Sequence, residues 1–240
     1  MTERLPQNYI PTHYDLYLHV KNDEYPFEAS VTITFRKNND FEKFYLHIDQ
    51  TIDIQKITQS NTSLDYTLDY PQLIINLAKT PEGDFSTNPI TIEYKVTPNL
   101  KRMHGFFKCN DTYLTNFEPT GARQLFPCFD EPFIRSTFSI KLLIPTNLRA
   151  LSNMPYETII QHGEEHEIIF QETPPICTYL VCLCIGTFSK ITAKTANGTN
   201  IEFYSTRGEV EKLNNYLNAA IYAVNWIEST FSVKYEMSHL

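Results

Sequence analysis

Glycine and basic residues are both scarce in this chain of 240 residues. Only seven residues are glycine, which is about 3% where roughly 7% is usual. Left-handed turn positions must therefore fall largely to Asn and Asp. The chain has 20 Lys and Arg against 28 Asp and Glu, so its net charge is −8. Because nucleic acids and anionic membranes attract an excess of basic residues, neither is expected as the main partner.

Long apolar segments are also lacking. The most apolar run, Leu180–Ile185, has six residues, whereas a membrane-spanning helix needs about 20. Residues Met1–Pro6 contain no apolar core of a secretory signal. We therefore expect a cytoplasmic protein without a membrane span. The five cysteines are an odd number, and without an export signal they are expected to be reduced thiols, mostly in the core.

Alternation of apolar and polar residues dominates the first 205 residues. It is clear in Ala29–Phe35, Phe44–Ile48 and Ile90–Val96, and breaker clusters such as Asn38–Asp40 and Thr97–Asn99 separate these runs. A period of two predicts half-buried strands. Short strands between regular breakers predict a mainly β protein, with an antiparallel sandwich or a saddle-like sheet.

Two later segments follow other patterns. Ile176–Phe188 is almost continuously apolar, which predicts a strand that is buried on both faces. After Arg207, apolar residues recur at steps of three and four, which predicts an amphipathic helix from about Glu209 to Thr230. One helix after a complete β domain suggests the start of a larger unit. The predicted apolar stripe contains Val210, Leu213, Leu217, Ala220, Ile221, Val224 and Ile227.

Two groups of residues have the composition of metal sites. His162 and His166 match the inverted zinc-protease pattern H-x-x-E-H, which needs both rings on one face of a helix. They lie in a predicted β-hairpin, so a structural turn is favoured over a metal site. Cys177, Cys182 and Cys184 lack a fourth ligand at a suitable spacing, so core thiols are favoured. We expect no metal in this chain.

The most informative segment runs from Tyr113 to Pro155. Glu118, Arg123, Asp130 and Glu131 lie there among phenylalanines and prolines. A carboxylate on such a stiff loop is suited to recognise a cation by charge-assisted hydrogen bonds. The alternative is an ion pair of Arg123 with Asp130 or Glu131 that only holds the loop together. Composition alone favours the second interpretation.

The run T-N-F-E-P-T-G-A-R-Q-L-F-P-C-F-D-E-P, followed by A-L-S-N-M-P at Ala150–Pro155, carries a family resemblance. It resembles the N-terminal domain of the aminopeptidase N family of zinc metallopeptidases, which includes the puromycin-sensitive and endoplasmic-reticulum aminopeptidases. The string Phe126–Pro132 is highly specific. Further similarity runs from Leu5–Pro6 near the start to Gly186–Phe188, so the resemblance covers nearly the whole chain.

The resemblance implies two parts. Residues 1–190 would form a saddle-like antiparallel β-sandwich domain that packs on a catalytic domain of the same protein and helps to close its active site. Residues 191–240 would be the opening strand and helix of that thermolysin-like α/β domain, which is incomplete here. The family's zinc ligands, exopeptidase loop and catalytic tyrosine would follow Leu240. No catalytic residue and no cofactor is therefore expected in this chain, and zinc is expected in the full-length member.

The resemblance also implies roles for individual residues. Glu118 matches the glutamate that binds the free α-amino group of the substrate, and Asn116 replaces a glutamine that lines the same site. Gly121 and Gln124 replace two charged residues of the family pattern. The charged residues expected to support this loop are Arg123, Asp130 and Glu131.

Two functions remain open from the sequence. In the first, the chain is the N-terminal part of a zinc aminopeptidase, and its partners are peptide N-termini and the catalytic domain in cis. In the second, it is a naturally short, non-catalytic protein that keeps the β domain as a peptide-binding or interaction module. The reading frame after Leu240 distinguishes them. Whether this chain alone is an enzyme stays open, and activity in isolation is not expected.

Overall fold

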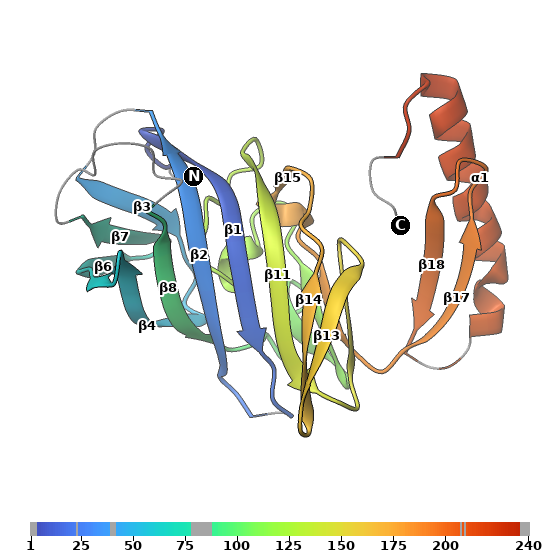
Figure 1. Cartoon of the computed structure of the whole chain (residues 1–240), viewed down its shortest axis with the longest axis horizontal. Coiled ribbons are helices and arrows are strands. Elements are labelled where there is room, and N and C mark those ends of the chain that lie inside the picture. Colours follow the sequence, from blue (N-terminus) through green and yellow to red (C-terminus); the bar gives the residue numbers. More distant parts are fainter. Residues whose placement is uncertain are drawn as a thin grey trace.

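A computed structural model gives the structure of residues 4–22, 24–38, 42–77, 88–206, 208 and 210–235. Strands dominate this described part of the chain, and α1 (Asn214–Phe231) is its one α-helix. The strands form four sheets, which lie in a large body and in a smaller C-terminal unit (Figure 1). The prediction of a mainly β protein with a helix near its C-terminal end is confirmed.

The largest sheet has nine strands. Its alternating pattern is clear in β2, where Phe27, Val31 and Ile33 are buried. Neighbouring strands are antiparallel except β1 and β11, which are parallel. The sheet is therefore not purely antiparallel, whereas the sequence predicted an antiparallel arrangement. The long segment between β1 and β11 returns to the end of the sheet at which β1 begins, as a parallel pair requires. Across the sheet the strands are β13 (Tyr156–His162), β14 (Glu165–Phe170), β11 (Arg135–Pro145), β1 (Tyr9–His19), β2 (Phe27–Lys37), β8 (Ile90–Val96), β4 (Ile52–Gln59) and β5 (Thr62–Ser63), and β15 (Ile176–Cys177) pairs with β11.

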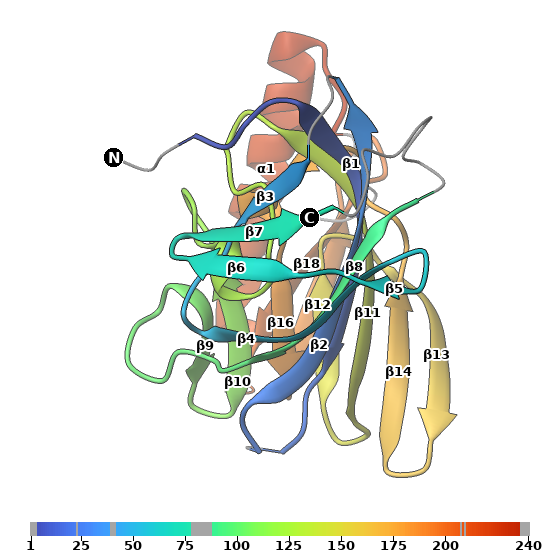
Figure 2. The ribbon, with the colours of Figure 1, turned by 90° about the vertical axis from the view of Figure 1, so that its left-hand side faces the viewer.

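Two smaller sheets complete the large body. The first of these sheets has the order β12 (Arg149–Ser152), β16 (Leu183–Gly186), β10 (Thr112–Asn116) and β9 (Gly105–Cys109). The second sheet has the order β3 (Lys43–His47), β7 (Gln72–Asn76) and β6 (Tyr66–Asp69). Figure 2 shows the second sheet facing the viewer, with β9 and β10 below it. One continuous hydrophobic core joins the three sheets, as expected for packed β layers.

Aromatic rings fill this core. Tyr14 stacks on Phe138, with 5.0 Å between the ring centroids. Tyr14 and Phe126 form an edge-to-face pair with 6.0 Å between the ring centroids, and Tyr9 and Phe129 form another with 5.3 Å. Phe126 and Phe129 belong to the family-specific string Phe126–Pro132, so this string is itself part of the hydrophobic core. Its charged residues are thereby held against the body of the protein.

The prediction of one continuous buried strand over Ile176–Phe188 is wrong. The segment forms β15, a 3-10 helix at Thr178–Leu180 and then β16. Side chains interrupt the ladder, because Asn153 accepts a hydrogen bond from the backbone N–H of Cys182 (2.8 Å) and donates one to the carbonyl of Leu180 (2.7 Å). Cys182 is consequently exposed rather than a core thiol.

The C-terminal unit pairs β17 (Ser189–Lys194) with β18 (Asn200–Ser205) and packs them on α1, which a 3-10 helix at Val210–Leu213 precedes. Its small core is separate from the large one. Ile227 is 50% exposed, whereas Glu228 is 7% exposed, so the predicted helical stripe is wrong at that position. The domain boundary expected between residues 190 and 191 stays a prediction. No helix in the described ranges is both long and apolar enough to cross a bilayer.

Glu228 closes the C-terminal unit through two hydrogen bonds. Its carboxylate accepts one from the backbone N–H of Tyr235 (2.9 Å) and one from Asn197 Nδ2 (2.8 Å). The bond from Tyr235, followed by that from Asn197, holds the pKa of Glu228 below its ordinary value of 4.5. A carboxyl group whose pKa is lower in the folded state than in the unfolded state stabilises the fold at pH values above its ordinary pKa. This contribution is lost as the pH falls through the pKa of the folded state.

We therefore expect the C-terminal unit to loosen first in acid, at a pH below the ordinary value of 4.5. Amide exchange of Tyr235 and Ala196, measured between pH 3 and pH 6, checks this expectation. The matched variant is Glu228→Gln, which keeps one acceptor oxygen and removes the titration. Its exchange, corrected for the intrinsic effect of pH, should not change across this range. Equal acid sensitivity of the variant and the parent would contradict the assignment.

Candidate functional site

Glu118 lies on a short turn between β10 and the 3-10 helix Ala122–Gln124. The preceding Phe117 is 2% exposed and packs its ring edge on Phe126 at 6.3 Å. The carbonyl of Phe117 accepts a hydrogen bond from the N–H of Gly121 (2.6 Å), which closes the turn, and the Glu118–Pro119 peptide bond is cis. Glu118 itself is exposed and forms no hydrogen bond or ion pair with the described residues. Its charge is therefore available to a ligand.

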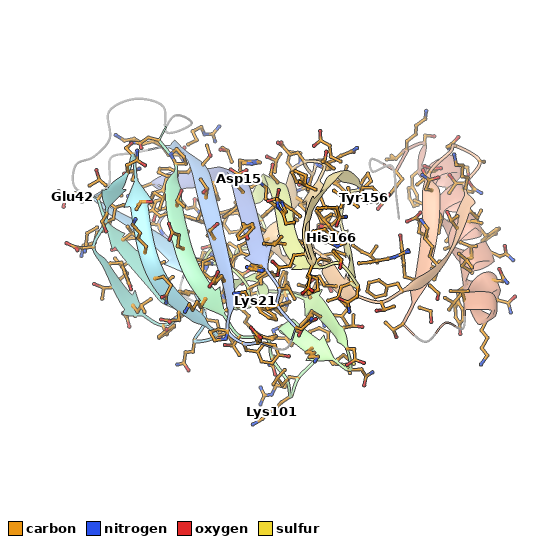
Figure 3. All side chains as sticks on the ribbon, turned by 60° about the horizontal axis from the view of Figure 1, so that its bottom comes forward. Asp15, Lys21, Glu42, Lys101, Tyr156 and His166 are labelled. Atoms are coloured by element: carbon orange, nitrogen blue, oxygen red, sulfur yellow. The ribbon has the colours of Figure 1, made fainter. Side chains whose placement is uncertain are left out.

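Asn116 is the last residue of β10, is exposed, and lies two residues before Glu118. Its Nδ2 donates a hydrogen bond to the carbonyl of Met103 (3.2 Å), in the loop between β8 and β9. Met103 is 67% exposed, and Lys101 of the same loop projects away from the body of the protein (Figure 3). The two predicted substrate-binding residues are thus both exposed at the end of β10, and the amide group of Asn116 also helps to hold a loop.

Arg123 and Asp130 form a buried ion pair behind the Glu118 turn. Arg123 Nε lies 2.8 Å from Asp130 Oδ2, and the side chains of both residues are almost fully buried. Asp130 Oδ1 also accepts a hydrogen bond from the hydroxyl of Thr178 (3.1 Å), and the N–H of Asp130 donates to His47 Nδ1 (3.2 Å). The hydrogen bond from Thr178 helps to offset the cost of burying the carboxylate, and the bond to His47 satisfies the buried N–H of Asp130.

Glu131 is hydrogen-bonded to Leu5 and not to Arg123. Its Oε1 accepts a hydrogen bond from the backbone N–H of Leu5 (2.7 Å), and the N–H of Phe129 donates to the hydroxyl of Tyr14 (3.1 Å). The segment therefore ties the start of the chain to the core. These contacts join positions far apart in the sequence, so no local pattern indicates them. The partners that the sequence did not reveal are Leu5, Tyr14, His47 and Thr178.

Burial makes the sulfur and phenol groups near this segment unreactive. It raises the pKa of the Cys128 thiol well above its ordinary value, and the nearby Asp130 raises it further. Burial also raises the pKa of Tyr14 and raises that of Cys184 to about 12. These groups stay protonated at neutral pH, so none of them is an activated nucleophile.

The two histidines of the H-x-x-E-H pattern point to opposite faces of a hairpin. In the pairing of β13 with β14, His162 is opposite Glu165, while His166 is opposite Gln161. Because cross-strand partners share a face and consecutive residues alternate, the two rings lie on opposite sides. Burial lowers the pKa of His166. Among the residues whose structure is described, no cluster of three or more His, Cys, Asp or Glu is suited to a metal ion.

Gly121 fixes how closely the Glu118 turn can approach its own backbone. A Cβ atom at this position would lie 2.9 Å from Phe117 Cα and 3.1 Å from both the Phe117 carbonyl and His104 Cε1. The φ angle of −95° is ordinary, so space rather than conformation makes the glycine necessary. We expect Gly121→Ala to displace the Phe117–Glu118 backbone and to cost about 1–3 kcal/mol of stability.

Backbone amide NMR shifts of Phe117 and Glu118, together with urea unfolding, check this prediction. Thr120→Ala is the control, because it removes atoms from the same turn without adding any near Phe117. At an unstrained position, replacing glycine by alanine usually stabilises a protein by about 0.4–1 kcal/mol. Such a gain in Gly121→Ala would contradict the close approach of residue 121 to the Phe117 backbone.

Apolar side chains also remain exposed on α1. The helix buries Leu217 and Val224 against β17 and β18. Its other faces carry large apolar side chains that are at least half exposed, a pattern typical of surfaces that pack against another part of a protein. The members of this exposed set, which we call the α1 surface, are Tyr216, Tyr222, Trp226, Ile227 and Phe231.

Comparisons with known proteins agree with this architecture. The model of the peptidase M1 N-terminal domain matches residues 10–180, and the chain belongs to this family. It is 29% identical to the puromycin-sensitive aminopeptidase of Caenorhabditis elegans and 30% identical to human endoplasmic reticulum aminopeptidase 2, over 98% and 99% of the chain. It is 35% identical to rice aminopeptidase M1-A over 62% of the chain. The chain spans about a quarter of the length of the first two relatives, 26% and 27%, and 18% of the third.

Proposed function

We propose that the chain is the substrate-anchoring part of a zinc aminopeptidase, which removes amino acids from the N-termini of peptides. The observation that carries this proposal is the state of Glu118, an exposed carboxylate with no partner among the described residues, on a turn whose backbone is anchored on both sides. A carboxylate in that position pairs with the α-ammonium group of a peptide. Charge-assisted hydrogen bonds of this kind contribute about 1.5–3 kcal/mol each.

Asn116 extends the same site. One N–H of its Nδ2 donates to the carbonyl of Met103, and its Oδ1 can accept a hydrogen bond from the substrate. The exposed Met103 and Leu100 lie on the neighbouring loop and supply apolar surface at the edge of the cleft. The β domain thereby anchors the end of the peptide and walls one side of the cleft.

The catalytic part of the protein would lie beyond this chain. In the proposal, β17, β18 and α1 begin the catalytic domain, and the α1 surface packs against the rest of it. A catalytic zinc site needs three protein ligands and an open position. The described residues do not fit zinc, because no suitable cluster exists among them. We therefore assign zinc to the continuing chain and derive no step through it. The cytoplasmic location expected from the sequence stays part of the proposal.

Peptide cleavage by the chain extended through its catalytic domain tests the proposed function. Peptides with a free N-terminus should be cleaved, and their N-acetylated forms should not, because acetylation removes the cation that Glu118 binds. Specific binding of free N-termini by a naturally short chain of 240 residues would instead support the non-catalytic peptide-binding alternative. Equal cleavage of free and acetylated peptides would contradict the role proposed for Glu118.

The α1 surface gives a further prediction for the 240-residue chain alone. We expect α1 to exchange its amide hydrogens faster than the central strands β1 and β2, or to drive self-association, because much of its apolar area has no cover. Hydrogen exchange and sedimentation measure the two outcomes. The matched variant Trp226→Gln should reduce any association without affecting β1. Protection of α1 equal to that of the central strands, in a monomer, would show that the C-terminal unit is complete as it stands.

A further inference from the structure

A small cavity lies between the start of the chain and the end of the family-specific segment. Its volume is about 170 Å³, and Leu5, Tyr9, Phe129 and Ile134 supply much of its apolar wall. Glu131 lines the same cavity. Cavities of about 150 Å³ accept a benzene-sized molecule, so this one has room for a short alkyl chain. It lies apart from the Glu118 turn and has no part in the proposed function.

The carboxylate of Glu131 is only half satisfied. The residue is 6% exposed, and its Oε1 accepts the hydrogen bond from Leu5. Its Oε2 is buried and has no hydrogen-bond partner in the described part of the chain. Leaving a buried acceptor unsatisfied costs about 1–3 kcal/mol, and more for a charged group. A donor that reaches this carboxylate from the cavity would offset part of that cost.

We infer that the cavity is a binding site for an alkylammonium group, with Glu131 as its counter-ion. The ammonium group would donate to the Glu131 carboxylate, and its alkyl stem would lie along the apolar wall. A Ca²⁺ or Mg²⁺ ion fits less well, because these ions need six or more oxygen ligands and Glu131 is the one carboxylate among the cavity's lining residues. The shared chemistry has two sources, a lysine side chain of another protein segment and a free amine.

Two arginines lie beside the cavity. The guanidinium of Arg4 lies 5.7 Å from the centroid of the Phe133 ring, in a cation–π contact. Arg135 lines the cavity as well. Neither arginine forms an ion pair with Glu131. Arg135 is thus a competing cation near the mouth, and its removal should favour an ammonium ligand.

Titration of the 240-residue chain with n-butylammonium chloride tests the inference at constant ionic strength. The backbone amide signal of Leu5 is the reporter, because this N–H bonds to the Glu131 carboxylate. We expect a saturable shift with n-butylammonium and none with n-butanol, which has the same alkyl chain without the charge. Nα-acetyl-lysine N-methylamide is the second probe. A shift with both amines points to lysine side chains, and a shift with n-butylammonium alone points to free amines.

Three variants make the test specific. Glu131→Gln keeps an acceptor for Leu5 and removes the charge, so it should weaken binding roughly 10–150-fold. Arg135→Gln should strengthen binding roughly two- to five-fold, and it serves if Glu131→Gln does not fold. Glu118→Gln should bind as the parent does, since that residue belongs to the proposed substrate site. The inference fails if n-butanol binds equally, if neither amine gives a saturable shift, or if binding is lost in Glu118→Gln rather than in Glu131→Gln.

Discussion

Glu118→Gln, made in the chain extended through its catalytic domain, should lower kcat/KM for free N-terminal peptides roughly 10–150-fold. This range corresponds to the loss of one charge-assisted hydrogen bond of about 1.5–3 kcal/mol. The glutamine has nearly the same shape but no charge to pair with the α-ammonium. Steady-state kinetics with an aminoacyl substrate and its N-acetylated form measure the effect. The acetylated form should be a poor substrate for both proteins.

Stability provides the control for this substitution. Glu118 is exposed and has no partner in the described residues, so the melting temperature should change little. Thr120→Ala on the same turn is the matched variant, since it changes the surface near Glu118 but leaves the carboxylate. Unchanged kcat/KM together with a melting temperature lowered by many degrees would show that Glu118 has a structural role, and the proposed function would then be wrong.

The sequence predicted the architecture well where the pattern was local. Alternating residues such as those of Phe27–Lys37 predict a strand because one face of the sheet is buried. The pattern failed at Ile176–Phe188, where apolar composition hid a 3-10 helix and side-chain hydrogen bonds from Asn153. Burial alone does not distinguish a straight strand from an irregular buried segment.

The sequence also predicted only part of the candidate site. The resemblance directed attention to Glu118, and the structure places that residue on an exposed, anchored turn. The choice between Asp130 and Glu131 as the partner of Arg123 needed the three-dimensional structure, because either carboxylate is within reach along the sequence. Long-range contacts decide it, since Thr178 and His47 hold Asp130, whereas Leu5 holds Glu131.

Arg123→Met should cause the largest loss of stability that we expect from a single substitution in this chain. The substitution leaves the carboxylate of Asp130 buried without its counter-ion. Removing one partner of a buried ion pair costs about 3–5 kcal/mol. For a protein of this size each kcal/mol lowers the melting temperature by about 2–4 °C, so a decrease of roughly 6–20 °C follows. Urea unfolding and thermal melting measure it.

The partly exposed pair of Lys141 and Glu167 is the matched control within the same body. Their charged atoms are 3.7 Å apart, and the side chain of Lys141 is 46% exposed, so water already solvates the pair. Lys141→Met should therefore cost no more than about 1 kcal/mol. The comparison isolates burial, because both substitutions replace a cation by methionine and leave one carboxylate behind. Losses of the same small size in both variants would mean that hydrogen bonds to Thr178 and the backbone hold Asp130, and that Arg123 adds little to the loop that carries Glu118.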